Sequence, residues 1–235
     1  MDPVPDEIPL PLAEPPPSWL AHLRACTNGC LRDLEAGQVL LREGERPPYF
    51  WVIQSGAVAL ASTTPSGRRA TVAILGRGAV LGEPRMSPNA SLSHSDLVSL
   101  PEARALITST VCSVPFPALR VAMASDPHLA WWIVVAVSRR ASQIQRTLAR
   151  TLALPVPLRL LGVLEDLTAE YGSPGPAGVG IEVPLTQDLL ASMVGVTRES
   201  VNRAIGDLER EGLVRRAGLR YVLSRPSVVS EDGRM

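Results

Sequence analysis

The sequence predicts an α+β fold in which a β-rich N-terminal half, a long helix and a C-terminal helix-turn-helix with a β wing follow one another. Residues 34–117 alternate apolar and polar side chains with a period of two and are interrupted by glycines, which is typical of short antiparallel strands. Apolar residues after Asp126 recur at steps of three and four, as in a helix. Two shorter helical patterns between 186 and 208 meet at Gly195, whose backbone freedom suits a tight turn.

Composition limits the class of protein. The chain has 235 residues and zero formal net charge, which allows two modest domains and excludes a polycation that coats nucleic acid. Residues 184–225 hold seven arginines against five acidic residues, a local positive excess. Three cysteines indicate a reducing compartment. The acidic, proline-rich N-terminus lacks a signal-peptide pattern, and the longest apolar run, Leu129–Val137, is too short to span a membrane. We expect a soluble, cytoplasmic protein with no membrane partner.

The two ends of the chain are expected to be loosely structured. Residues 1–17 are rich in proline and poor in large apolar groups, which predicts a flexible arm, and residues 227–235 are predicted to be a frayed tail. Between them, the β-rich domain is predicted over 18–125, beginning with a short helix at Trp19–Ala25. Its many short strands predict a sandwich or barrel, with a hairpin loop at Thr64–Gly67.

A long helix is predicted over 126–154, opened by Asp126 and Pro127, because proline is common at the first helical position. Its apolar positions follow the a and d pattern of a coiled coil, which predicts the interface of a homodimer. These positions are Val134, Val137, Ala141, Ile144, Leu148 and Thr151. The alternative is that the helix packs on the β domain, which we expect of Trp131 and Trp132 near its start.

The C-terminal domain is predicted over 155–226. Pro155 and Pro157 are expected to end the long helix and to form a hinge. A helix over Leu158–Tyr171, a turn rich in glycine and proline, and the helix-turn-helix follow. The run L-V-R-R-A-G-L-R-Y-V-L then predicts a two-stranded wing that turns at Gly218.

The helix-turn-helix carries the residues with the clearest predicted role. Thr186 and Thr197 are good N-caps for its two helices. In such motifs the first turns of the second helix reach base edges, where arginine donates to guanine and glutamate accepts from cytosine. The predicted base-reading residues are Arg198, Glu199, Asn202 and Arg203. The predicted contacts to the DNA backbone are Thr186, Thr197, Ser200 and Arg220. The alternative is a solvated helix face with an ion pair at i, i+4.

Three stretches resemble one known family. They are F-W-V-I-Q-S-G-A-V at 50–58, G-A-V-L-G-E at 78–83 and V-T-R-E-S-V-N-R at 196–203. With the order of the predicted elements, they make residues 19–226 similar to the CRP/FNR family of bacterial transcription regulators. The resemblance implies a β-roll like a cyclic-nucleotide-binding domain, a dimerisation helix and a winged helix-turn-helix. It also implies double-stranded DNA with a TGTGA-like half-site, a second copy of the chain and RNA polymerase as partners.

The predicted sensor departs from the cyclic-nucleotide binders of that family. Gly82-Glu83 matches their pattern, but no arginine follows near 91–95 to hold a cyclic phosphate, and neither Arg85 nor Arg104 matches the motif. Ile144-Gln145 replaces the Thr-Ser pair of the family's dimer helix. Losing one charged hydrogen bond costs about 1.5–3 kcal/mol, so cyclic AMP is a disfavoured effector. The candidate effector pocket, for an unknown signal, comprises Gly82, Glu83, Ile144 and Gln145.

The cysteines allow a redox alternative. By resemblance to the oxygen-sensing branch, Cys112 stands where a ligand of an iron–sulfur cluster is found, with Cys26 and Cys30 as further thiolates. Such a cluster usually needs four ligands, so His22 or Asp33 would have to supply the fourth. A thiol or nitric-oxide switch is a second reading, and three structural thiols are the preferred one. No cofactor is firmly predicted.

An enzyme is the third class considered. A metal-dependent β-barrel enzyme needs clustered histidine and carboxylate ligands, but His22, His94 and His128 are scattered along the sequence. No catalytic triad pattern, phosphate loop or pair of catalytic acids is present. We therefore expect a regulator without enzymatic activity, or a ligand-independent architectural DNA-binding protein in which the β domain serves only as a dimer scaffold.

Overall fold

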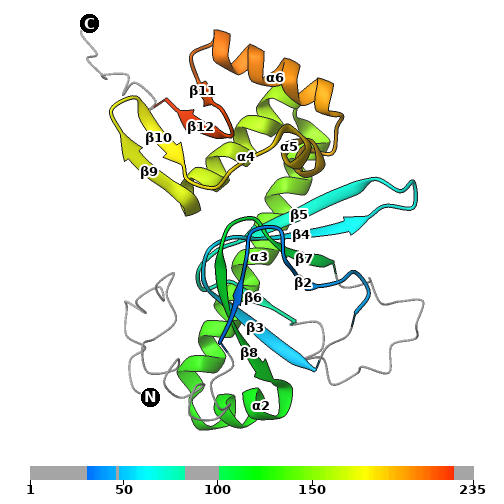
Figure 1. The fold of residues 1–235 in the computed structure, drawn as a ribbon, viewed down its shortest axis with the longest axis vertical. Helices are drawn as coiled ribbons and strands as arrows, with labels where there is room; N and C mark the ends of the chain where they lie inside the picture. Colours follow the sequence, from blue (N-terminus) through cyan, green and yellow to red (C-terminus); the bar gives the residue numbers. More distant parts are fainter. Residues whose placement is uncertain (1–30, 46–47, 83–100, 225–235) are drawn as a thin grey trace, which may run out of the picture.

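A computed structural model describes residues 31–45, 48–82 and 101–224. In these residues a β-rich part, a long helix and a C-terminal helix-turn-helix follow one another, as the sequence predicts (Figure 1). Several expectations lie outside the described residues. They concern the arm, the helix Trp19–Ala25, the tail, His22, Cys26, Cys30, Glu83 and His94.

The described N-terminal part forms two antiparallel four-stranded sheets, with the orders β1-β8-β3-β6 and β2-β7-β4-β5. The predicted hairpin loop joins β4 and β5, where Thr63 pairs with Arg69. The strands are β1 Leu31–Leu34, β2 Val39–Leu41, β3 Tyr49–Ser55, β4 Val58–Thr63, β5 Arg69–Leu75, β6 Val80–Leu81, β7 Glu102–Ala105 and β8 Ser109–Pro115. The expected β-rich N-terminal domain of many short antiparallel strands is thereby confirmed.

Strand β3 is buried on both faces, which explains its unbroken apolar run. Trp51 and Ile53 contribute to the core between the two sheets. Their neighbours Phe50 and Val52 belong to a second core, which also contains Trp132 of the long helix. Since successive side chains of a strand point to opposite faces, a strand between two cores must be apolar throughout.

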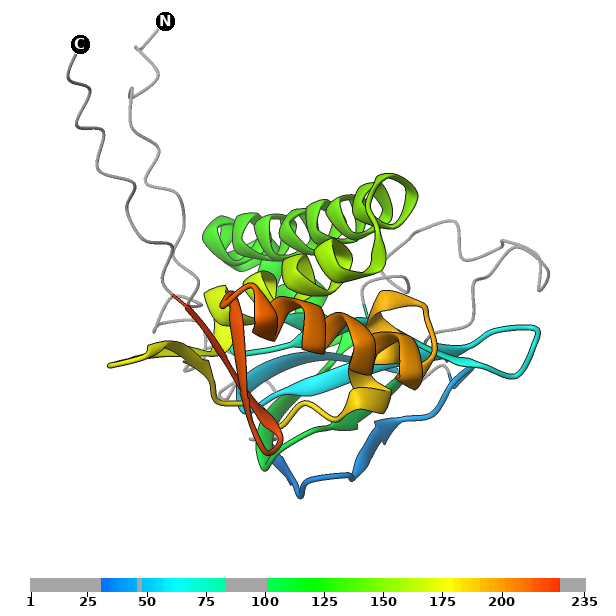
Figure 2. The same ribbon diagram turned by 90° about the horizontal axis from the view of Figure 1, so that it is seen from above.

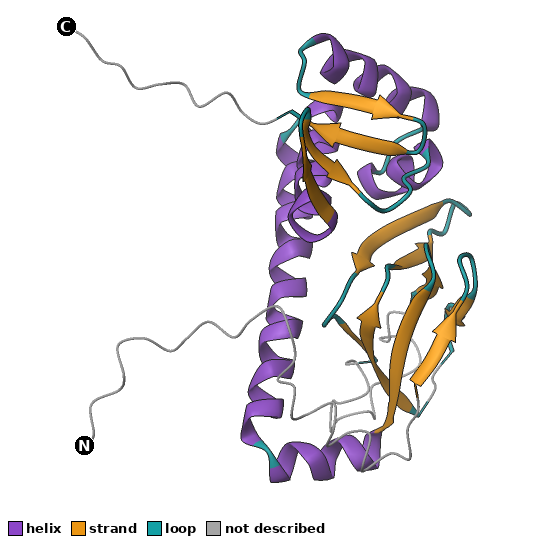
Figure 3. Ribbon diagram, turned by 60° about the vertical axis from the view of Figure 1, so that its left-hand side comes forward, coloured by secondary structure: helices purple, strands orange, loops and turns teal. Residues whose placement is uncertain are grey.

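Two helices follow the sheets, α2 (Phe116–Ser125) and α3 (Pro127–Ala153). Asp126 caps α3 by accepting a hydrogen bond from the His128 N–H (3.0 Å). Figure 3 shows α3 running past the strands to the C-terminal helices. Trp132 is buried, as expected, but the prediction for Trp131 is wrong, since 52% of it is exposed. Neighbouring residues of a helix point in directions about 100° apart, so only one of the two tryptophans packs on the β domain.

The C-terminal part begins with α4 (Val156–Tyr171), two residues earlier than predicted, with Pro157 in its first turn. The segment expected as a turn is a hairpin of β9 (Gly172–Gly175) and β10 (Gly178–Ile181). The wing strands β11 (Val214–Ala217) and β12 (Arg220–Leu223) turn at Gly218, as predicted. The structure adds one feature to the predicted wing, because β12 also pairs with β10 in a sheet of the order β11-β12-β10-β9.

Among the described helices, none is long and apolar enough by itself to cross a membrane. Only α2 and α3 taken together pass that test of length and composition, and the pair is bent by 118°.

The β-roll packs against the C-terminal part through apolar and polar contacts. Ala57 and Ile74 of the roll join the core of α4 and of the helix-turn-helix. The Thr71 and Ser192 hydroxyls lie 2.7 Å apart, and the Gly76 N–H donates to Glu170 Oε1 (2.9 Å). Two residues of the roll are therefore buried in the core of the C-terminal part, while the rest of the roll packs in cores of its own.

Two glycines of the helix-turn-helix provide a matched test of backbone conformation. Gly195 adopts φ +76°, and neither it nor Gly206, within the second helix, would place an added Cβ within 4 Å of another group. We expect Gly195→Ala to lower the free energy of unfolding by about 1–2 kcal/mol, because only its backbone is strained for an L-residue. Gly206→Ala should raise it by about 0.5–1 kcal/mol. Chemical denaturation measures both, and equal effects of the two changes would contradict the assignment.

Candidate nucleic-acid interface

The helix-turn-helix consists of α5 (Gln187–Val194) and α6 (Arg198–Arg210). Both predicted N-caps form, since Thr186 Oγ1 accepts from the Leu189 N–H (3.1 Å) and Thr197 Oγ1 from the Ser200 N–H (3.3 Å). Gly195 turns the chain in the left-handed conformation at the C-cap of α5. Local sequence signals thus set the start of both helices and the turn between them.

One face of α6 is fully buried. Val201, Ala204, Ile205 and Leu208 are each at most 2% exposed. They pack in one core with α4 and α5, and burying each valine, isoleucine or leucine contributes about 1.5–3 kcal/mol. The opposite face of α6 must therefore lie outward, and the view from above shows the helix on the outside of the molecule (Figure 2).

The four predicted base-reading residues are all exposed on that outer face: Arg198, Glu199, Asn202 and Arg203. Arg198 Nε donates to Gln187 Oε1 (3.2 Å), and its Nη1 lies 3.9 Å from Asp188 Oδ2. The other end of the Gln187 amide, Nε2, donates to Asn202 Oδ1 (2.9 Å). Gln187 thus connects two of the predicted readers. Gln187 was not among the predicted residues, because both of its partners lie on the other helix.

Glu199 is positioned to act as a hydrogen-bond acceptor. A hydrogen bond with its own backbone N–H lowers the pKa of Glu199, and the Thr197 side chain and the nearby Arg198 and Arg203 lower it further. The carboxylate is therefore ionised at neutral pH and suits a donor such as cytosine N4. Arg203 Nη2 donates to Ser200 Oγ at 3.4 Å, which is long for a hydrogen bond.

The residues predicted to contact phosphates lie at the ends of elements. Thr186 and Thr197 are exposed and use their hydroxyls as caps, while Ser200 is half-buried. Arg220, on the wing, lies 3.5 Å from Glu182 Oε2 in an exposed ion pair. Two further exposed arginines of the wing were not predicted, although they stand in the quoted run: Arg215 and Arg216.

The predicted effector residues lie on two elements. Gly82 is buried after β6, with φ +102°, and an added Cβ there would lie 2.8 Å from the Tyr49 carbonyl oxygen. Ile144 and Gln145 are exposed on α3. Arg140 of α3 donates to the Val80 carbonyl (3.3 Å), so the helix approaches β6 one turn before Ile144.

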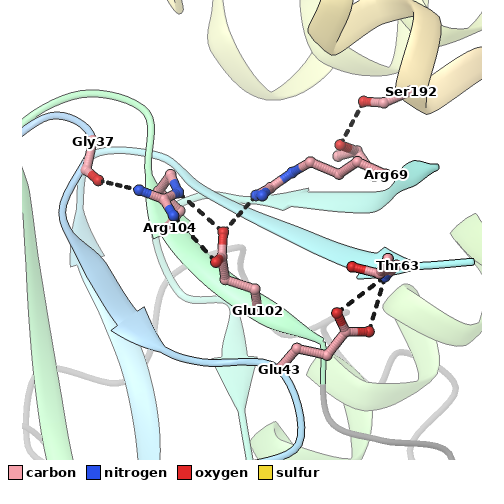
Figure 4. Close-up of polar contacts among 8 residues, drawn as sticks. Gly37, Glu43, Thr63, Arg69, Glu102, Arg104 and Ser192 are labelled. Atoms are coloured by element: carbon pink, nitrogen blue, oxygen red, sulfur yellow. Dashed lines mark hydrogen bonds and ion pairs between the residues drawn. The ribbon is translucent and has the colours of Figure 1, made fainter. Parts of the chain in front are cut away.

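Arg104 is hydrogen-bonded to other groups on the roll (Figure 4). Its Nε and Nη2 donate to the Glu102 carboxylate (3.0 and 3.1 Å), and its Nη1 donates to the Gly37 carbonyl (2.8 Å). Arg69 also donates to Glu102, at 2.6 Å. The hydrogen bond from Arg104, followed by that from Arg69, lowers the pKa of Glu102 against its partial burial. This pairing supports the exclusion of Arg104 as a phosphate ligand.

Cys112 lies in β8, 1% exposed, in the core that also contains Phe50 and Trp132. That position suits a structural thiol better than an accessible redox centre. Within the described ranges, no group of three or more histidine, cysteine or acidic side chains is placed to hold a metal ion. Asp33, considered as a fourth ligand, accepts a hydrogen bond from Thr110 (2.8 Å).

An exposed apolar stripe extends along α3. Of the predicted interface positions, Val134, Ala141, Ile144, Leu148 and Thr151 are exposed, whereas Val137 packs partly against the core. Trp131 and Leu152, 52% and 79% exposed, extend the stripe in both directions. Both were absent from the predicted set. The exposed stripe is thus longer at both ends than the predicted seam, and Val137 contributes less to it.

Comparison with known proteins matches both parts of the chain. Residues 31–126 match the model of the cyclic nucleotide-binding domain, and residues 158–227 match the Crp-like helix-turn-helix domain. A CRP-like cAMP-activated global transcriptional regulator of Mycobacterium tuberculosis is 28% identical over 193 residues, covering 82% of this chain and 83% of that protein. A global nitrogen regulator of Synechococcus elongatus is 26% identical over 202 residues, covering 86% and 89%.

The fold is also similar to that of a solved structure, the c-di-GMP responsive global regulator CLP of Xanthomonas campestris. The TM-score is 0.70 at 22% identity, over 86% of this chain and 97% of that one.

The cap of α6 gives a test of how the exposed face is held. Thr197→Ala removes the acceptor of the Ser200 N–H, so we expect the free energy of unfolding to fall by about 1 kcal/mol. Thr197→Ser keeps the hydroxyl oxygen and should restore most of that loss. Chemical denaturation of the three proteins measures the effect. If the serine variant were as unstable as the alanine variant, the cap would not be the cause.

Proposed function

Because this chain belongs to the CRP/FNR family of transcriptional regulators, we propose that it acts as a homodimer that reads a TGTGA-like palindrome. The coarser statement, a transcriptional regulator with a DNA-binding helix-turn-helix, follows from the family itself. The observation that supports the finer one is the outer face of α6. Arg198, Glu199 and Arg203 are all exposed in its first turns.

The chemistry of these side chains suits G·C base pairs. The planar guanidinium of arginine donates to guanine O6 and N7, and the ionised Glu199 accepts from cytosine N4. Glu199 and Arg203 are separated by one helical turn, so they address neighbouring base pairs. Gln187 fixes Arg198 and Asn202 relative to each other before DNA arrives, which lowers the entropy lost on binding.

A homodimer through α3 accounts for the exposed apolar stripe. Trp131, Val134, Leu148 and Leu152 are each more than half exposed, and such a patch on one helix marks an interaction surface. Two copies related by a twofold axis bury the same stripe against itself. They also present two α6 helices to half-sites about 34 Å apart on one face of DNA.

We propose control through the β-roll by a signal other than cyclic AMP. The relatives described above are named for different signals, cAMP, nitrogen and c-di-GMP, so their names support no single effector. Residues 91–95 hold no arginine for a cyclic phosphate, and Arg104 is paired with Glu102. The shared core of roll and helix-turn-helix gives a route by which a ligand shifts the population of DNA-competent dimers. RNA polymerase is the expected partner of the DNA-bound form.

DNA binding by the full-length protein tests the proposed reader. The DNA is a TGTGA-N6-TCACA duplex. We expect Arg198→Ala and Arg203→Ala each to weaken the binding free energy by about 1–3 kcal/mol. This corresponds to a loss of affinity of roughly tenfold to a hundredfold. Fluorescence anisotropy at fixed salt measures this. Arg210→Ala is the control, because Arg210 is an exposed arginine in the last turn of α6 that pairs with Asp207. Equal affinity of the wild type for a scrambled duplex would reject the half-site.

Self-association tests the proposed dimer helix. Leu148 is 57% exposed on the stripe, and Leu148→Glu would place a carboxylate in the interface. We expect the dissociation constant of the dimer to rise roughly thirtyfold or more. Analytical ultracentrifugation measures this change. Val121→Glu is the matched control, because Val121 is 61% exposed on α2 and is not part of the stripe. A dimer unaffected by Leu148→Glu, or weakened equally by Val121→Glu, would contradict the proposal.

A further inference from the structure

Gln187 hydrogen-bonds to two of the predicted base-reading residues at once. It is the first residue of α5 and is half-buried, whereas Arg198 and Asn202 are exposed one turn apart on α6. Residues four apart in a helix lie on the same side, so one glutamine reaches both. Arg198 Nε donates to Gln187 Oε1 (3.2 Å), and Gln187 Nε2 donates to Asn202 Oδ1 (2.9 Å). The three side chains form a chain of hydrogen bonds on the face proposed to meet DNA.

The chemistry of arginine fixes the direction of both hydrogen bonds. A guanidinium has only donors, so the group of Gln187 that faces Arg198 must be the carbonyl oxygen. The nitrogen of the same amide then faces Asn202 and, because it only donates, it requires the oxygen of the Asn202 amide. Asn202 is thereby oriented with Oδ1 toward Gln187 and Nδ2 away from it. Within the described ranges, the Asn202 side chain makes no other hydrogen bond.

We propose that Gln187 determines the base preference of Asn202 by leaving its amide nitrogen as the group that meets DNA. An asparagine amide can serve a base as a donor, as an acceptor or, with adenine, as both. Because Oδ1 is engaged by Gln187, Asn202 offers a donor. A donor suits the major-groove acceptors of guanine and thymine and does not suit cytosine, whose N4 group is itself a donor. This inference rests on the proposed function, because it concerns how the proposed readers select bases.

The substitution Gln187→Glu reverses this arrangement at nearly constant shape. Both oxygens of a carboxylate accept hydrogen bonds, so Arg198 keeps its partner. The amide of Asn202 must then turn over, because only its Nδ2 can donate to the new carboxylate. Oδ1 of Asn202 now faces the DNA, where an acceptor suits cytosine N4 or adenine N6. The preferred base at the position read by Asn202 therefore changes, while the preferences at the other positions stay the same.

Binding of the full-length protein to a set of duplexes tests the inference. The duplexes carry each base pair in turn at each position of the half-sites of TGTGA-N6-TCACA, and fluorescence anisotropy measures the affinities. Asn202→Ala identifies the position that Asn202 reads, as the one where the preference is lost. There we expect the wild type to prefer guanine or thymine over cytosine roughly twofold to tenfold, and Gln187→Glu to reverse the preference. Ratios at fixed salt cancel the uniform repulsion from the added charge.

Gln38→Glu is the matched control, because it makes the same substitution at an exposed residue of the roll, where Gln38 Oε1 accepts from the Glu35 N–H (3.0 Å). It should keep the base preferences of the wild type.

Nuclear magnetic resonance of the protein without DNA gives a second readout. The side-chain amide protons of Asn202 should exchange with solvent more slowly in Gln187→Glu, where one of them is hydrogen-bonded, than in the wild type. Equal exchange in the two proteins, an unchanged base preference in Gln187→Glu, or no position that responds to Asn202→Ala overturns the proposal, as does the same reversal by Gln38→Glu. A wild type that binds every duplex equally rejects the half-site and this inference together.

Discussion

The buried face of α6 is the constraint on which the rest of the molecule depends. Val201, Ala204, Ile205 and Leu208 are almost completely removed from solvent in a core shared with α4 and α5. A helix with one face fixed in this way has no freedom to rotate about its axis. Its arginines and glutamate are therefore presented at fixed positions, and specificity for a base sequence needs that fixed register. The N-caps and Gly195 then set where the helix begins.

The long helix α3 is buried against the β-roll near its start and exposes apolar side chains farther along. Near its start Leu129, Trp132 and Ile133 are buried against the β-roll. Farther along, its apolar side chains are exposed, and the side of the helix beside them carries Arg150, which is tied to Asp166 on α4. The same helix thus contacts the roll, the C-terminal part and, in the proposed dimer, a second copy.

Features set by neighbouring residues were predictable from the sequence. The cap at Asp126 and the caps and turn of the helix-turn-helix depend on nearby residues, and all appear as predicted. The predicted alternation of the strands does not hold in β3 and β4, which are buried on both faces. Contacts between distant residues were not. The β9–β10 hairpin has turn-like composition and becomes a strand pair because β12 extends the sheet. The choice between Trp131 and Trp132 depends on where the roll lies, and Gln187 became important only once α5 and α6 were placed together.

The pairing of arginines differs between the roll and the C-terminal part. A cyclic phosphate needs an unpaired cation inside the roll, and on the described part of the roll Arg69 and Arg104 both bind Glu102. The cation with an unsatisfied buried donor is instead Arg159, where the long helix meets the helix-turn-helix. A desolvated guanidinium nitrogen that lacks a hydrogen-bond partner lowers stability. The packing of α4 against α5 is therefore less favourable at Arg159 than the packing of the roll is at its two paired arginines.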